Sequence, residues 1–293
     1  MQTGYFNAAW QDIKNSPGWV GKLLLLSLLL FIPVFGYIVM MGYLLGWARD
    51  MAWGVHAPLP QRIFGNEDGK LYSRGFFAWV ISMALGVVLA LATFLLTCLM
   101  SFVLGLGFVG AVGHHAGIAM VGVAAALLSV LSIILPIAAS LAGALFQWVG
   151  WMRMSVYARL SAGFQFGKIW AMIRHDFGGI ARILGMGVLI LLVGGIAIVL
   201  LGLVVLLIVF ALAAFSVGMG AVAEAPSWAV WAVLLALVAL LAFAYAGMVL
   251  SVFTQMMTLR ALGYWTRGFE VPLWRGQDDP LPFQMRAAGA QGR

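Results

Sequence analysis

The chain has 293 residues, of which 64% are hydrophobic and only 9% are charged, and its formal net charge is +7. Because soluble domains carry about 45–50% apolar and about 25% charged residues, this composition excludes an ordinary soluble protein and predicts a membrane protein. The basic residues lie between the apolar stretches without forming a basic face or a recognition motif, which excludes nucleic-acid binding. The single cysteine, Cys98, lies inside an apolar stretch, so neither a disulfide framework nor a cysteine metal site is expected.

A short amphipathic helix is predicted near the N-terminus. Apolar residues recur at helical spacing between Phe6 and Ile13, and Pro17 ends the pattern. Trp10 lies on the apolar side and Lys14 on the polar side, which is typical of a helix in the lipid headgroup zone. No small-residue cleavage site follows, so the segment is not expected to be a classical signal peptide.

The first apolar stretch covers residues 23–47 and contains Pro33 and Gly36. Proline removes a backbone donor and clashes with the preceding turn, so these residues predict a helix break. At about 1.5 Å per residue the stretch could just span a hydrocarbon core of about 30 Å as one kinked helix. The alternative is two half-helices that enter and leave on one side. We favour the second, because it keeps the N-terminus on the side of the cation-rich loops described below.

Four longer apolar stretches follow, and each is interpreted as one crossing. The region from Gly75 to Met152 has no charged residue, and its polar break at His114 and His115 predicts a tight turn between two helices. Pro136 is expected to bend the second of these helices. The four crossings cover residues 76–112, 117–150, 183–215 and 228–255. The sequence thus predicts an all-α integral membrane bundle with four to five main spanning segments.

Lysine and arginine are distributed unevenly between the predicted loops. The loop 49–74 has four of them, segment 153–182 has five and the tail from residue 260 has five, whereas the loop 216–227 and the turn at the two histidines have none. Because cytoplasmic loops are enriched in lysine and arginine, we expect the three cation-rich parts, including the C-terminus, to be cytoplasmic. The expected location is the inner (plasma) membrane of the cell.

A second amphipathic helix is predicted at residues 164–177, and it matches the first at an offset of 160 residues. Trp10 aligns with Trp170 and Lys14 with Arg174. This favours two related halves, as is common in membrane proteins, although headgroups select similar residues in any interfacial helix. The expected organisation is a single membrane domain with a first half at 1–160, a second half at 161–265 and a polar tail at 266–293.

Basic and tryptophan side chains at the predicted helix ends are candidates for contact with lipid headgroups. Lysine and arginine can extend from a helix end to lipid phosphates, and tryptophan suits the same depth. Generic anchoring and a specific headgroup site are both compatible with this pattern. The candidates are Trp10, Lys14, Lys22, Arg49, Arg153, Arg159, Trp170, Arg174, Arg182 and Arg260.

Enzymatic motifs are absent from the sequence, which has no Walker loop, no Gly-x-Ser-x-Gly elbow and no His-Glu-x-x-His. We therefore expect no catalytic residue, no metal site and no cofactor. His114 or His115 could be the axial ligand of a haem-like group, but a polar break between two helices is the simpler interpretation. Gly42 and Gly46 have the spacing that lets membrane helices approach closely.

The runs 42–49, 57–60 and 71–76 resemble a bacterial and archaeal multi-pass family catalogued as domain of unknown function 4013. Residues 154–166 are similar to the start of that family's second half. The resemblance covers roughly residues 5–270. It departs from the family at residues 61–62, Gln-Arg, where an acidic residue usually follows Leu-Pro. The resemblance implies a multi-pass membrane protein and carries no established activity, so it transfers no functional residues.

The preferred function is non-catalytic: a scaffold or accessory subunit that packs against membrane lipids and other membrane proteins, or against itself. The glycine-rich, charge-free helices and the missing reactive motifs favour this interpretation. The alternative is a transporter or channel-like protein for lipid or another apolar substrate, which would use the break at Pro33 and a repeat partner near Gly194 and Gly195. A third possibility is a cofactor-carrying subunit with a histidine ligand.

Overall fold

The computed structural model describes residues 4–65, 68–111, 115–218 and 226–291, which contain helices and no strand. The chain divides into two compact units. The first consists of Met1–Gly75 with Gly178–Arg293, and the second of Phe76–Phe177. These boundaries differ from those of the two sequence halves, so the internal repeat stays a prediction. The described residues are all-α, as expected, and include long apolar helices able to span a membrane.

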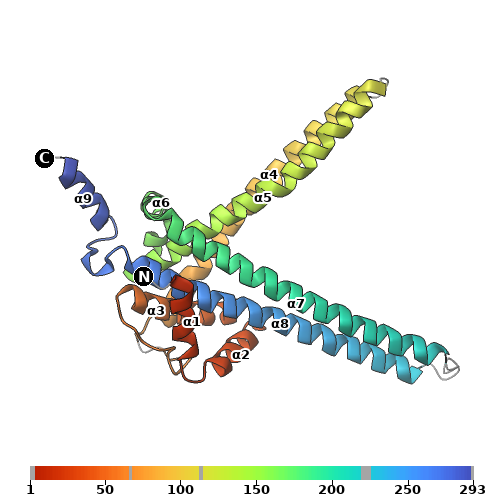
Figure 1. Ribbon diagram of the computed structural model, residues 1–293, viewed down its shortest axis with the longest axis horizontal. Helices are drawn as coiled ribbons and strands as arrows, with labels where there is room; N and C mark the ends of the chain where they lie inside the picture. Colours follow the sequence, from red (N-terminus) through yellow and green to blue (C-terminus); the bar gives the residue numbers. More distant parts are fainter. Residues whose placement is uncertain (1–3, 66–67, 112–114, 219–225, 292–293) are drawn as a thin grey trace. The chain divides into compact units, whose positions relative to one another are not determined.

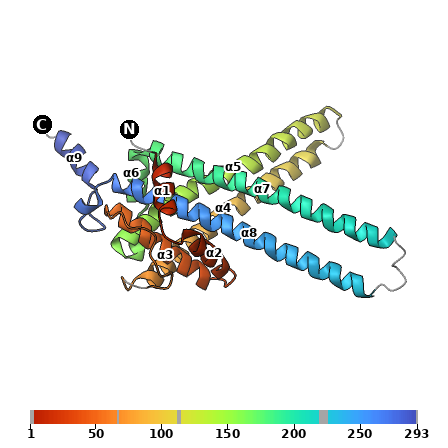
Figure 2. The ribbon, with the colours of Figure 1, turned by 60° about the horizontal axis from the view of Figure 1, so that its bottom comes forward.

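The first unit is built around the last part of α8, on which three short N-terminal helices pack (Figure 2). The buried side chains of Met51, Leu259 and Trp265 belong to this core. A Cβ on Gly263 would lie 2.5 Å from the carbonyl oxygen of Ala48, so glycine lets α8 approach α3 closely. The elements are α1 (Tyr5–Lys14), α2 (Trp19–Leu29), α3 (Phe35–Ala52), α7 (Phe177–Gly218), α8 (Pro226–Arg267), η3 (Val271–Leu273) and α9 (Pro282–Gln291).

The apolar stretch 23–47 is broken into two helices, as its proline suggested. Helix α2 ends at Leu29 and α3 begins at Phe35, with Pro33 in the intervening turn. A Cβ on Gly36 would overlap the carbonyl oxygen of Leu29, so glycine permits the tight return. The 11 residues of α2 span only about 16 Å, too short to cross a hydrocarbon core of about 30 Å. The stretch is therefore not one continuous crossing.

Four described helices are long and apolar enough to cross a membrane, namely α4 (Leu71–Ala111), α5 (His115–Tyr157), α7 and α8. They form two antiparallel pairs, α4 with α5 and α7 with α8 (Figure 1). Glycines lie at contacts within each pair. A Cβ on Gly143 would lie 2.5 Å from Leu89, and one on Gly202 would lie 2.8 Å from Phe243.

Two positions singled out in the sequence do not end the long helices. Helix α5 continues through Pro136, and the bend expected at this proline stays a prediction. Helix α7 is likewise continuous through Gly194 and Gly195. The proposed repeat partner of the break at Pro33 is therefore an unbroken helix.

The second unit holds the rest of α4, α5, η1 (Leu160–Phe164) and α6 (Phe166–His175). The Trp151 indole donates a hydrogen bond to the carbonyl oxygen of Ala78 at 3.1 Å, joining α5 to α4. The Gln147 amide donates to the Ser82 hydroxyl at 2.9 Å. Both polar side chains are thus satisfied within the helix pair.

Helices form at both segments with an amphipathic pattern, and their apolar residues pack on protein. In α1, Ala9 and Ile13 are buried on the side that contacts α8. In α6, which packs on α5, Ile169 and Ile173 are buried. An apolar stripe is the same whether it faces a lipid interface or a protein core, and intramolecular packing explains much of it here. A headgroup location for these helices stays a prediction.

Candidate functional site

A buried arginine joins three helices of the first unit. Arg260 of α8 is 0% exposed, and its Nε donates to Asp12 Oδ2 of α1 at 2.6 Å. Its Nη1 donates to the carbonyl oxygen of Trp47 of α3 at 2.8 Å, and its guanidinium carbon lies 4.3 Å from the centroid of the Trp47 ring. The Tyr264 hydroxyl also donates to Asp12 Oδ2, at 2.8 Å. The charge, its partner and the aromatic face form one network that holds α1, α3 and α8 together.

The positions of Arg260 and Arg153 differ from the expectation that they extend to lipid headgroups. Arg153 is also 0% exposed, its Nη2 donates to Gln165 Oε1 at 2.5 Å, and its guanidinium carbon lies 5.4 Å from the ring centroid of Tyr157. An arginine at the end of an apolar run gives the same sequence pattern whether it reaches lipid or a distant partner. Asp12, the partner of Arg260, is 248 residues away in the sequence, and no local signal could have found it.

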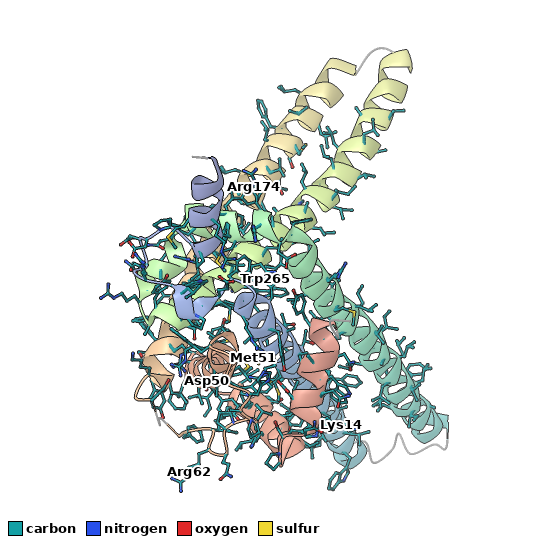
Figure 3. All side chains as sticks on the ribbon, turned by 60° about the vertical axis from the view of Figure 1, so that its left-hand side comes forward. Lys14, Asp50, Met51, Arg62, Arg174 and Trp265 are labelled. Atoms are coloured by element: carbon teal, nitrogen blue, oxygen red, sulfur yellow. The ribbon has the colours of Figure 1, made fainter. Side chains whose placement is uncertain are left out.

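The other headgroup candidates are dispersed over the surface or engaged in local contacts. Trp10 contacts the rings of Trp19 and Phe253 edge-on, whereas Trp170 is 50% exposed and stacks on Phe146. Four of the basic candidates are exposed, and two of these four are labelled in Figure 3. These four are Lys14, Arg159, Arg174 and Arg182. Generic anchoring by this set stays a prediction.

A second charged cluster ties the loop after α3 to the start of α4. Asp68 forms ion pairs with Arg49, at 3.0 Å, and with Arg74. Arg74 is nearly buried and also donates to the carbonyl oxygen of Gly42 at 3.1 Å. Partial burial alone would raise the pKa of Asp68, but the hydrogen bonds from Arg74 and the Lys70 N–H, together with the charges of both arginines, lower it below its ordinary 3.8. The headgroup candidate Arg49 therefore serves an intramolecular contact.

The D68N variant tests this cluster. A carboxyl group whose pKa is lowered by folding stabilises the fold above its ordinary pKa and loses that contribution as the pH falls through the lowered value. We expect Asp68→Asn to destabilise the first unit by about 1–2 kcal/mol at pH 7, because it weakens a charged hydrogen bond to a nearly buried arginine. The measurement is thermal unfolding in detergent between pH 7 and pH 3. The difference in stability between the variant and the wild type should become smaller below about pH 4. The same difference at pH 3 as at pH 7 would contradict the stabilising role of the Asp68 carboxylate.

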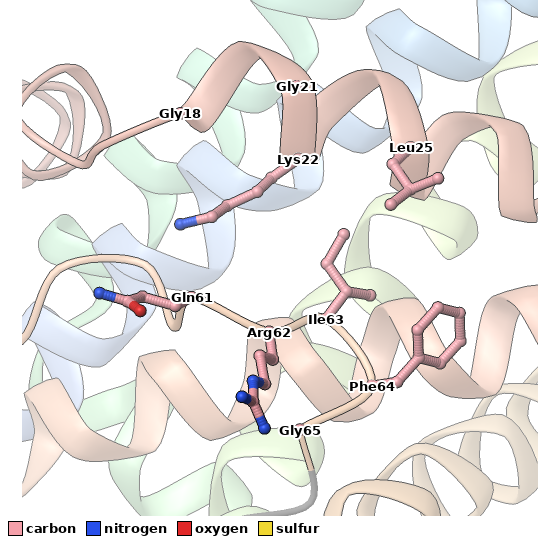
Figure 4. Close-up of a pocket in the computed structure, with 9 residues that line it drawn as sticks. All are labelled: Gly18, Gly21, Lys22, Leu25, Gln61, Arg62, Ile63, Phe64 and Gly65. Atoms are coloured by element: carbon pink, nitrogen blue, oxygen red, sulfur yellow. The ribbon is translucent and has the colours of Figure 1, made fainter.

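An open cleft of about 850 Å³ lies between α2 and residues 61–65. Figure 4 shows the charged end of Lys22 near Gln61, and the apolar side chains of Leu25 and Phe64 away from that end. The Lys22 ammonium donates to the carbonyl oxygen of Leu59 at 3.1 Å. The lining of the cleft is polar at one end and apolar at the other. The lining residues are Gly18, Gly21, Lys22, Leu25, Gln61, Arg62, Ile63, Phe64 and Gly65.

Histidine and metal chemistry receive no support from the described part of the chain. His114 lies outside the described residues, and so does the side chain of His115, whose backbone begins α5. Among the residues that are described, no group of three histidine, cysteine or carboxylate side chains is placed to hold a metal ion. The cleft at Lys22 is a candidate ligand site on its own lining, which combines cationic and apolar side chains.

The residues that the structure describes include four helices long and apolar enough to span the bilayer, which defines the class as a multi-pass membrane protein. Its sequence matches the family described as Protein of unknown function (DUF4013) over residues 25–203. The chain belongs to this family, as the runs 42–49, 57–60 and 71–76 suggested. No curated protein and no solved structure matches the chain.

Proposed function

We propose that this protein is a non-catalytic membrane scaffold or accessory subunit that packs its long helices against other membrane proteins and lipid. The observation that carries the proposal is that many apolar side chains of these helices are exposed and do not pack against the rest of the chain. In the most apolar 18-residue segment of each of α4, α5 and α7, no residue is buried against the rest of the chain. In the corresponding segment of α8, only 6% of the residues are buried. Side chains such as Leu95 and Leu207 are 65% and 66% exposed. An apolar surface of this extent is unfavourable in water and must contact lipid or another protein.

The length of the helices favours a protein partner as part of that cover. Residues 183–215 of α7 contain no charge over 33 positions, which corresponds to about 50 Å of helix. Fitting that length into a hydrocarbon core of about 30 Å would need a tilt of about 53°, beyond the usual range of about 0–40°. Apolar turns beyond the lipid would be exposed to water unless another protein covers them.

A transporter function has weaker support. It would use paired broken helices near the middle of the membrane, but the counterpart of the break at Pro33 is the continuous helix α7. We propose the plasma membrane as the location, with residues 49–74, residues 153–182 and the C-terminus in the cytoplasm. The distribution of lysine and arginine supports this orientation.

Site-specific photocrosslinking in intact membranes tests the scaffold proposal. A photoreactive residue at Leu95 or Leu207 should crosslink to another protein chain, because these exposed side chains face the surface that a partner would cover. The matched control is Leu262 of α8, which is 0% exposed and should give no intermolecular product. Crosslinking to lipid alone at a series of exposed positions along all four long helices would contradict the proposal.

A further inference from the structure

Two cations line the cleft beside α2, and Figure 4 shows their charged ends apart, that of Lys22 toward Gln61 and that of Arg62 toward Gly65. Lys22 and Arg62 both line it, and none of its described lining residues is acidic. The hydrogen bond to Leu59 positions the Lys22 ammonium, and partial burial lowers the Lys22 pKa because it removes water from the charged form. An anion bound at this end would compensate for that lost hydration.

The opposite end of the cleft suits a hydrocarbon chain. Leu25 and Phe64 are 44% and 48% exposed there, while Ile63 beneath them is buried (Figure 4). Exposed apolar side chains next to a cationic pocket match a ligand that carries a negative charge and a fatty tail on the same molecule.

Glycine keeps the α2 wall of the cleft open. A Cβ placed on Gly21 would have no heavy atom within 4 Å, so this wall faces open space. A large side chain at this helical position would fill the cleft without displacing a neighbour. Gly21 therefore offers a way to block the space while both cations remain.

We propose that this cleft binds one anionic phospholipid, with its phosphate at the Lys22 ammonium beside Gln61 and an acyl chain along Leu25 and Phe64. The positive charge of Arg62 on the neighbouring loop adds to the attraction. The cleft would select a ligand by two chemical features. The ligand has a phosphate diester in a headgroup without a positive charge, and it carries a hydrocarbon chain. This site goes beyond the scaffold function and does not depend on it.

The test is calorimetric titration of the full chain in neutral detergent with dioctanoyl phosphatidylglycerol. We expect saturable binding at one site, and binding at least about tenfold weaker in the Lys22→Gln, Arg62→Gln double variant, because the cation at the phosphate and the second positive charge of the cleft lining are both lost. Arg62→Gln alone should weaken binding too, and Arg62 is exposed, so this variant is expected to fold. Gly21→Leu should weaken binding although both charges remain. The matched control is Arg275→Gln, which removes an exposed cation outside the cleft and outside the set of headgroup candidates, and it should leave the affinity unchanged.

Two further ligands separate the sources of the phosphate. Dioctanoyl phosphatidylcholine should bind more weakly, because its choline cation would lie near Lys22 and Arg62. Inorganic phosphate should bind more weakly as well, because it lacks the chain that contacts Phe64. Equal affinity for inorganic phosphate, with no effect of Gly21→Leu, would overturn the proposal in favour of a free-anion site. An equal loss in Arg275→Gln and in the double variant would overturn it in favour of non-specific charge.

Discussion

Replacing Arg260 with methionine is expected to destabilise the first unit by about 3–5 kcal/mol, the cost of breaking a buried ion pair from one side. The substitution keeps most of the side-chain length but removes the charge that bonds to Asp12 and to the Trp47 carbonyl, which lie on two other helices. The cation–π contact with the Trp47 ring is lost as well. Thermal unfolding in detergent should show a large fall in the transition temperature.

Arg267 provides the control for this experiment. It lies seven residues further along the same helix, is exposed, and its Nη1 lies 3.0 Å from His56 Nε2. Arg267→Met should cost less than about 1 kcal/mol, as is usual for exposed charged contacts. Asp12→Asn should produce a loss nearer to that of the Arg260 variant, because it leaves the buried guanidinium without its carboxylate. If the Arg260 and Arg267 variants unfold at the same temperature, the network does not hold the three helices together.

Adding a methyl group to Gly42 or Gly75 is the second change with a large expected effect. A Cβ on Gly42 would overlap the carbonyl oxygen of Leu71, and one on Gly75 would overlap that of Ile38. The clashes involve backbone rather than a flexible side chain, so α3 and the start of α4 must move apart. We expect each Gly→Ala variant to lose about 1–3 kcal/mol or more in unfolding measurements in detergent.

Gly86 is the matched control for the glycine variants because it lies on the same helix as Gly75. A Cβ on Gly86 would have no heavy atom within 4 Å. Gly86→Ala should therefore leave stability unchanged or raise it by up to about 1 kcal/mol, since alanine favours the helix. If Gly42→Ala and Gly75→Ala change the free energy of unfolding no more than Gly86→Ala does, the close approach of α3 and α4 has no role in stability.

Several predictions from local patterns agree with the structure for identifiable reasons. The charge-free runs of more than 30 residues form the four long helices, because an apolar stretch of that length is typical of a membrane-spanning helix. Pro33 lies in a turn between two helices, since proline removes a donor where Gly36 also allows the chain to return. Pro136 does not end its helix, which continues on both sides, and the bend expected there stays a prediction.

The candidate site was only partly predictable. Lys22 was a candidate because it precedes an apolar run, but Arg62 belongs to a loop 40 residues away and has no periodic pattern around it. Only the folded path of that loop beside α2 brings the two cations to one cleft. Arg153 and Arg260 show the opposite case, since their positions at helix ends suggested lipid contact and the fold buries both.

The sequence by itself determined the medium in which this chain is stable, the number of its long apolar helices and the family to which it belongs. These properties depend on composition and periodicity over 20 or more residues, which are local quantities. Tertiary structure alone decided which charges are buried, which glycines allow helix contact and where two cations face an open space. Those properties depend on pairs of residues far apart in the chain, such as Asp12 and Arg260, whose encounter no local pattern encodes.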